Sequence, residues 1–198
     1  MKAFWEARYD EEAYVYGKAP NAFLAEHLPQ YEPGRLLLPG EGEGRNAVFA
    51  AALGWEVTAF DFSRAAREKA LALAARQNVS IRYVLAEMRS FPFEAEGYDA
   101  AALIFVHLPP EERRHLHRQV WQSLARDGIL FLEAFSKAQL GRSSGGPKQP
   151  DMLFSPDDLL DDLPEADILH RAETEIELDE GPYHQGAASV IRWIAKKN

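Results

Sequence analysis

Short apolar runs alternate along this chain with longer stretches in which apolar residues recur at helical spacing. Five such runs occupy residues 35–39, 55–61, 79–84, 98–105 and 129–135. Runs of this length between turn residues are typical of buried strands. Because helical stretches separate them, their order predicts a mostly parallel sheet with helices on both faces.

The helical stretches carry recognisable start and stop residues. We expect the first helix over residues 46–53 and the second after Ser63, whose hydroxyl can cap it. A third helix is expected to begin at the Pro109-Pro110 pair, where the N–H groups have no helical partner in any case. Gly128 is the expected end of that helix, since glycine is common just after a helix C-terminus.

Two strand-like segments, residues 166–178 and 187–195, lie near the C-terminal end on either side of the turn Gly181-Pro182. Their separation by a short turn predicts an antiparallel hairpin added to the edge of the sheet. The expected fold is therefore a doubly wound α/β domain with seven strands, formed by residues 1–198 as a single domain.

Composition narrows the class of protein. The 198 residues include no cysteine, and no apolar run approaches the roughly 20 residues of a membrane helix. The charged N-terminus lacks the apolar stretch of a secretory signal. The formal net charge of −9 argues against general nucleic-acid binding, which needs a basic face. We therefore expect a cytoplasmic protein with no membrane or nucleic-acid partner.

A glycine-rich turn joins the first predicted strand to the first predicted helix, with the sequence Gly40-Glu41-Gly42-Glu43-Gly44-Arg45-Asn46. In an open parallel sheet, ligands bind beyond the carboxyl ends of the strands, where such a turn lies. Asp61 ends the second strand about 20 residues later and can accept hydrogen bonds from both hydroxyls of an adenosine ribose. NAD, FAD and S-adenosylmethionine all bind in this geometry; the alternative is a tight turn beside an ordinary surface aspartate.

The spacing of the glycines helps to choose among these cofactors. Dinucleotide sites favour Gly-x-Gly-x-x-Gly, but here the third glycine comes one residue early and Arg45 takes its place. Glu41 and Glu43 would also repel a pyrophosphate, whereas a cationic sulfonium would not be repelled. The turn therefore favours S-adenosylmethionine, and an NAD-dependent oxidoreductase is the less favoured alternative.

With these motifs the sequence resembles the class I S-adenosylmethionine-dependent methyltransferases, and more narrowly their small tellurite-resistance and thiol-methyltransferase-like branch. The narrower resemblance rests on the glycine turn, on residues 57–61, and on Tyr14-Val15-Tyr16-Gly17, which is similar to an N-terminal segment that folds over the cofactor. It covers residues 4–154 and implies that residues 1–30 form a lid. The sequence departs from the family at Leu38, where many members carry an acid.

The resemblance implies a set of cofactor-binding residues: backbone groups of the turn at the methionine end, an acid on the ribose, and residues around the adenine and the reacting end. Arg45 and Asn46 either contact the cofactor carboxylate or cap the turn. The full set is Gly40, Glu41, Gly42, Gly44, Arg45, Asn46, Asp61, Phe62, Glu87, Met88 and Phe105.

Three places are candidates for the acceptor side. Tyr16 can face the sulfonium through its ring, or can simply pack within the lid. His107 follows the fourth strand and can deprotonate an acceptor, or can be a hydrogen-bonded turn histidine. Residues 136–150 form a predicted loop with three basic residues and no acidic one, which either closes over an anionic acceptor or is a solvated loop.

These features predict methyl transfer to a small soluble acceptor, such as a thiol or a metalloid oxyanion. Soft acceptors of this kind need no general base, so the absence of an obvious one does not count against an enzyme. A non-catalytic module that binds S-adenosylmethionine is the alternative. No metal site is expected, because His115 and His117 lie on different faces of one helix. The edge hairpin leaves both a monomer and a homodimer open.

Overall fold

The computed structural model describes residues 2–198, so Met1 of the predicted lid lies outside the described residues. Seven strands form one sheet in the order β3-β2-β1-β4-β5-β7-β6, with parallel pairing in most of it and antiparallel pairing at the C-terminal strands. This confirms the predicted fold class. The chain divides into two compact units, the first made of the residues up to 92 together with 180–183, and the second of 93–179 and 184–198.

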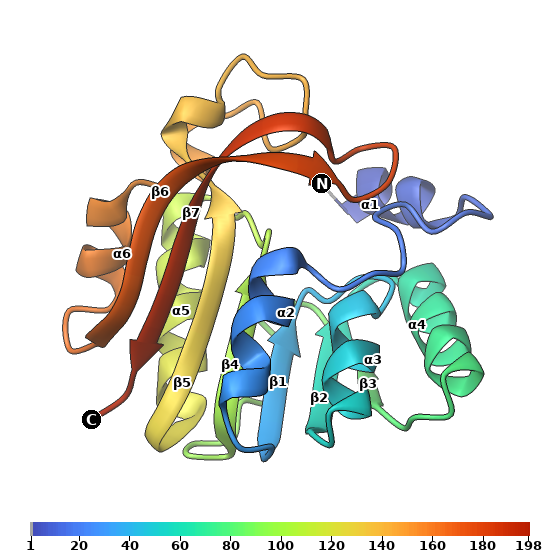
Figure 1. The fold of residues 1–198 in the computed structure, drawn as a ribbon, viewed down its shortest axis with the longest axis horizontal. Helices are drawn as coiled ribbons and strands as arrows, with labels where there is room; N and C mark the ends of the chain where they lie inside the picture. The colour runs from blue at the N-terminus through green and yellow to red at the C-terminus, as the bar shows by residue number, and fades with distance from the viewer. Residues whose placement is uncertain (1) are drawn as a thin grey trace. The chain divides into compact units, whose positions relative to one another are not determined.

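In the first unit, β1 (Arg35–Pro39), β2 (Glu56–Asp61) and β3 (Arg82–Leu85) pair in parallel. Four of the five residues of β1 are buried, as expected for a strand covered on both faces. Two helices connect these strands: α3 (Arg45–Ala52) packs against β1 and β2, and α4 (Arg64–Arg76) packs against β2 and β3 (Figure 1). The predicted cap of α4 is present, because the Ser63 hydroxyl accepts a hydrogen bond from the Ala66 N–H at 3.2 Å.

The N-terminal segment of the first unit holds two helices and a 3-10 turn. They are α1 (Lys2–Tyr9), α2 (Ala22–His27) and η1 (Leu28–Gln30). α1 packs against α4, on the side where β2 ends. Asn21 caps α2 by accepting a hydrogen bond from the Leu24 N–H at 3.0 Å.

The second unit contains β4 (Tyr98–Ile104) and β5 (Leu124–Phe135) in parallel, followed by two antiparallel strands. β7 (Gln185–Lys196) pairs with β5, and β6 (Asp167–Asp179) pairs with β7 and forms the sheet edge, as the predicted hairpin requires. α5 (Pro110–Ser123) packs against β5, and α6 (Pro156–Asp162) packs against α5 (Figure 1). The two helices are joined by Asp162, which accepts hydrogen bonds from Arg113.

Two element boundaries differ from the sequence prediction. α5 ends at Ser123 rather than at Gly128, because Leu124 turns into extended backbone, is fully buried, and pairs with Tyr98 of β4. β3 begins at residue 82 rather than 79, because the Val79 N–H is used to close the end of α4 on the Ala74 carbonyl at 3.0 Å.

Residues 136–150 are tethered to the strand beside them rather than forming an open solvated loop. They include the 3-10 turn η2 (Lys137–Gln139), and a second, η3 (Pro150–Met152), follows. Gln139 is buried and accepts a hydrogen bond from the Ser189 N–H of β7 at 2.8 Å. The Ser144 hydroxyl donates to the Ala187 carbonyl of the same strand at 2.7 Å.

None of the helices within residues 2–198 combines the length and the apolar character that a membrane span requires.

Gly44 is a glycine whose replacement we expect to be costly. Its φ is +88°, and an added Cβ would lie 2.5 Å from the Ala70 Cβ of α4. Gly44→Ala should therefore lower the free energy of unfolding by about 3 kcal/mol, from left-handed strain plus overpacking. Gly141 is a matched control, since its φ is +89° but no atom lies within 4 Å of its added Cβ.

Gly141→Ala should cost about 1 kcal/mol, from strain alone. Urea unfolding of both variants measures the difference. Equal losses in the two variants would show that contact with Ala70 is not what restricts Gly44.

Candidate functional site

The glycine turn lies where β1 ends and is closed onto β2. Gly40, Gly42 and Gly44 have φ values of 63°, 63° and 88°, which side-chain-bearing residues rarely adopt. The N–H groups of Gly40 and Glu41 both donate to the Phe60 carbonyl, at 2.8 and 3.3 Å. The turn is therefore a fixed structure at the carboxyl end of the strands.

Asp61 is brought to this turn, as the sequence predicts. Its carboxylate accepts hydrogen bonds from the Gly42 N–H at 3.2 Å and from the Ser63 N–H at 2.9 Å. Asp61 is buried, and burial raises its pKa against the lowering effect of these backbone bonds. A carboxylate offers about four acceptor positions, so Asp61 can still accept a bond from a ligand hydroxyl.

Two tyrosines that the sequence analysis did not single out pack against Gly42. The Tyr83 hydroxyl donates to the Gly42 carbonyl at 2.5 Å. The Tyr9 hydroxyl lies 2.7 Å from the position that a Gly42 Cβ would occupy, so α1 approaches the turn only because residue 42 is glycine. Burial, reinforced by the charge of Asp61, raises the pKa of both phenols well above the ordinary value. No spacing in the sequence connects these tyrosines to the turn.

The two glutamates of the turn hold different parts of the first unit. Glu41 Oε1 accepts two successive backbone N–H groups at the start of α3, each at 2.8 Å. Burial raises the pKa of Glu41 to about 7 despite these bonds. Glu43 pairs with Lys69 of α4 at 2.8 Å and accepts the Val15 N–H at 2.7 Å, which ties the N-terminal segment to the turn.

Arg45 and Asn46, predicted either to contact the cofactor carboxylate or to cap the turn, bind other segments of the first unit. Arg45 forms an ion pair with Glu180 at 2.9 Å and donates to the Tyr16 carbonyl at 3.3 Å. The Asn46 side-chain carbonyl accepts the Asn21 N–H at 2.9 Å. The Arg45 guanidinium is thus engaged with Glu180 and the Tyr16 carbonyl, both in the first unit, and its contact with a cofactor carboxylate stays a prediction.

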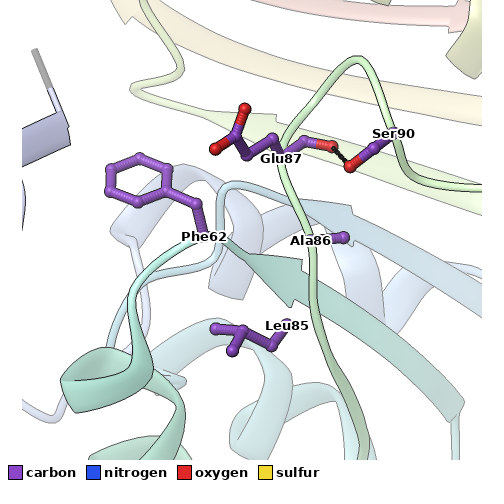
Figure 2. Close-up of a pocket in the computed structure, with 5 residues that line it drawn as sticks. All are labelled: Phe62, Leu85, Ala86, Glu87 and Ser90. Atoms are coloured by element: carbon purple, nitrogen blue, oxygen red, sulfur yellow. Dashed lines mark hydrogen bonds between the residues drawn. The ribbon is translucent and has the colours of Figure 1, made fainter.

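A pocket of about 270 Å³ opens beside Asp61, between the end of β2 and the segment after β3. The backbone there is held by the Ala86 N–H, which donates to the Asp61 carbonyl at 3.0 Å. Figure 2 shows the side chains of Phe62 and Glu87 projecting to the same side of the pocket, with Leu85 beside them. Its lining residues are Phe62, Leu85, Ala86, Glu87 and Ser90. Met88, which was also predicted to edge the adenine, is not part of this lining.

The second unit places Phe105 in an aromatic cluster with a histidine that the sequence analysis missed. Phe105 has a φ of 53° and its N–H donates to the Glu133 carbonyl at 2.7 Å. Its ring centroid lies 4.7 Å from the rings of both Phe135 and His184. His184 is buried just beyond the hairpin tip, and its position near Phe105 follows only from the β5–β7 pairing.

His107 cannot act as a general base in this arrangement. Its Nδ1 lies 2.8 Å from the Met152 carbonyl, and its Nε2 accepts the Phe135 N–H at 3.2 Å. Burial lowers the pKa of His107 to about 4. Both ring nitrogens are therefore used by the backbone, and the predicted catalytic role gives way to the alternative of a hydrogen-bonded turn histidine.

The Tyr16 hydroxyl accepts a hydrogen bond from Arg8 at 3.1 Å, and its ring lies 6.3 Å from that of Trp5. Burial raises the pKa of Tyr16, which makes the phenol a poor base at neutral pH. These contacts match the alternative in which Tyr16 packs within the N-terminal segment.

The basic loop is largely neutralised by acids from neighbouring elements. Lys137 pairs with Asp158 at 2.8 Å, and Arg142 pairs with Glu175 of β6. The local positive surplus that the sequence suggested is thus smaller in the folded chain. Across residues 2–198 no group of three or more histidine, aspartate or glutamate side chains is placed to hold a metal ion.

Comparison with known families finds one family model that matches part of the chain. Residues 37–128, from β1 to just inside β5, match the family model described as a methyltransferase domain. This segment is thus similar to a methyltransferase domain, and S-adenosylmethionine-dependent methyltransferases are among the solved structures that share the fold. No curated protein matches the sequence.

Three solved structures share the fold. One, described for the conversion of a disulfide bond into a thioacetal group during echinomycin biosynthesis, has a TM-score of 0.76 and 16% identity over 99% of this chain and 89% of that one. TehB from Haemophilus influenzae has a TM-score of 0.75 and 16% identity over 98% of this chain and 66% of its own.

The third is 1,6-didemethyltoxoflavin-N1-methyltransferase from Burkholderia thailandensis, with bound 1,6-didemethyltoxoflavin and S-adenosylhomocysteine. It has a TM-score of 0.66 and 20% identity over 89% of this chain and 76% of that one. At these identities the three likenesses concern the fold.

The low pKa of His107 makes a testable contribution to stability. Folding shifts it from 6.5 to about 4, so below pH 6.5 the unfolded chain takes up a proton that the folded chain does not. Stability should fall from about pH 6.5 to about pH 4, by up to about 3 kcal/mol from this residue. His107→Asn removes the effect, so its free energy of unfolding should approach that of the wild type as the pH falls.

Urea unfolding at pH 4, 5, 6 and 7 measures this difference, with His115→Asn on the exposed face of α5 as the control. A gap between wild type and His107→Asn that stays constant with pH would contradict the assignment.

Proposed function

We propose that this protein transfers the methyl group of S-adenosylmethionine to a small acceptor with a soft nucleophilic atom, such as a thiol or a metalloid oxyanion. The observation that carries the proposal is the position of Asp61. Its carboxylate is hydrogen-bonded to the glycine turn, and the next residue, Phe62, lines a pocket together with Glu87. The first unit can thus bind the adenine, the ribose and the methionine portion of one ligand.

The residues of the first unit match the chemistry of this cofactor. The pocket offers an aromatic face at Phe62 and an acceptor at Glu87, which suit the ring and the amino group of an adenine. Asp61 suits the ribose hydroxyls, and the backbone of Gly40, Gly42 and Gly44 suits the methionine portion. Met88 remains a proposed contact of the adenine, although it does not line the pocket. Phe105 remains a proposed contact at the reacting end.

Bound S-adenosylmethionine supplies a methyl group already activated by a positive sulfur. The chain's own contribution is then to bind, orient and exclude water. The buried carboxylates of Glu43 and Asp61 lie close to the turn, and negative charge there favours a cationic ligand. Tyr9 of α1 and Tyr83 of β3 pack against the same turn and cover it from water.

We infer a soft acceptor because neither His107 nor Tyr16 is available as a general base. Both ring nitrogens of His107 are bonded to backbone, and burial raises the pKa of Tyr16. An acceptor that is already ionised or strongly nucleophilic needs no proton removed.

Isothermal titration calorimetry with S-adenosylmethionine, S-adenosylhomocysteine and NADH tests the cofactor. We expect the two adenosyl compounds to bind and NADH not to bind, because Glu41 and Glu43 would repel its pyrophosphate. Tight binding of NADH alone would overturn the proposal.

A radiolabelled-methyl transfer screen over thiols, selenite, tellurite, phenols and amines tests the acceptor. Transfer is expected to the thiols or to the metalloid oxyanions. Labelling of phenols or amines only would reject the soft-acceptor part of the proposal. Binding with no transfer to any class would favour the non-catalytic module instead.

Asp61→Asn isolates the ribose contact. Loss of the charged acceptor should raise the Kd for S-adenosylhomocysteine at least about tenfold, since hydrogen bonds to a charged group contribute about 1.5–3 kcal/mol. Asp151→Asn, the same change at an exposed residue, should leave the Kd unchanged. Equal Kd values for the two variants would remove Asp61 from the site.

A further inference from the structure

Residues 11–21 contain neither helix nor strand, so bonds to other parts of the first unit hold them in place. The Val15 N–H donates to Glu43 Oε2 at 2.7 Å, and the Asn21 N–H donates to the Asn46 side-chain carbonyl at 2.9 Å. A segment without a hydrogen-bond ladder of its own opens at low cost once such contacts are lost. Its position is therefore set by the residues that touch it.

These residues cover part of the glycine turn. Gly42 and Glu43 are buried, and Val15, which is bonded to Glu43, has none of its surface exposed. Lys69 of α4 holds the same region by donating to the Ala13 carbonyl at 2.8 Å. A ligand that uses the backbone of the turn therefore needs residues 11–21 to move aside.

Residues 180–183 press on this segment through a glycine. They follow β6 in the sequence but belong to the first unit. Gly181 has a φ of +83°, and an added Cβ would lie 2.5 Å from the Val15 carbonyl oxygen and 3.0 Å from the Gly17 nitrogen. Both are backbone atoms, so no side chain can rotate to make room. This close approach requires glycine at residue 181.

Polar contacts from the same four residues reach both ends of the segment. Glu180 forms its ion pair with Arg45 at 2.9 Å, with 12% and 9% of the two side chains exposed. The Asn21 side-chain amide also donates to Glu180, at 3.4 Å. The Tyr183 hydroxyl donates to the Glu11 carboxylate at 2.8 Å. Because Glu11 and Asn21 are the first and last residues of the segment, it is held along its whole length.

We propose that residues 180–183 act as a strap, and that its release lets residues 11–21 open and so sets how fast the methyl donor enters and leaves. The inference rests on the proposed function, which supplies the ligand at the glycine turn. Gly181 contacts the backbone of the segment and none of the residues assigned to the cofactor. A contact that is equally strong with and without ligand changes the rates of opening but shifts no binding equilibrium.

Gly181→Ala loosens the strap, because the added Cβ cannot fit against the Val15 carbonyl. Stopped-flow fluorescence measures the association and dissociation rate constants of S-adenosylhomocysteine. We expect both constants to rise about tenfold, from the overpacking of the closed form, and the Kd to stay within about twofold of the wild type.

Gly186→Ala is the matched control. Gly186 follows the strap by three residues and has a φ of +97°, but no atom lies within 4 Å of its added Cβ. It therefore carries the same left-handed strain without the contact, and its rate constants should equal those of the wild type.

Hydrogen exchange tests the strap without any ligand. The Val15 and Asn21 N–H groups should exchange about tenfold faster in Gly181→Ala than in the wild type or in Gly186→Ala. Unchanged exchange within α4 shows that Gly181→Ala is folded. Equal exchange of Val15 and Asn21 in all three proteins would overturn the strap.

Tyr183→Phe is a milder variant that adds no atom. It removes the bond to Glu11, so both rate constants should rise about threefold. Wild-type rate constants in Tyr183→Phe and in Gly181→Ala would overturn the control of ligand entry. A raised Kd with only the dissociation rate increased would also overturn it, because that pattern marks a lost ligand contact. A wild-type chain that binds no adenosyl compound would overturn the proposed function, while the exchange comparison would still decide the strap.

Discussion

The first unit is organised by the need to satisfy three carboxylates in and beside the glycine turn. Glu41 is met by the N–H groups that begin α3, Asp61 by those of the turn and of Ser63, and Glu43 by Lys69 and the N-terminal segment. An unsatisfied buried charge would cost several kcal/mol, so each partner is fixed where the acid requires it. The turn, a helix start and the N-terminal segment are thereby held in one arrangement around the proposed ligand.

The parts of this arrangement that the sequence predicts are those governed by local chemistry and by sheet topology. Parallel strands bring their carboxyl ends to one edge, so the glycine turn and Asp61 were expected together. The Ser63 cap follows from the preference of a hydroxyl for free N–H groups. The boundary of α5 was predicted wrongly, because Gly128 is a reasonable helix end locally, whereas pairing of Leu124 with Tyr98 depends on another strand.

The roles of individual side chains were harder to predict, since they depend on partners distant in the sequence. His107 has the right residue type and place for a base, but its nitrogens meet Met152 and Phe135, which lie 45 and 28 residues away. Arg45 lies in the glycine turn, but its partner, Glu180, is 135 residues away in the sequence. No sequence motif marks Tyr9, Tyr83 or His184. Their positions follow only from the packing of the folded chain.

The ion pair between Arg45 and Glu180 also has a consequence for how the protein is made. The two residues are separated by 135 positions, and synthesis proceeds at about 5–20 residues per second. The glycine turn therefore leaves the ribosome roughly ten seconds before the hairpin tip that anchors its arginine. Gly181, which packs against the Val15 backbone, emerges with that tip. A segment synthesised long after the rest of the first unit thus supplies the contacts that hold Arg45 and Val15.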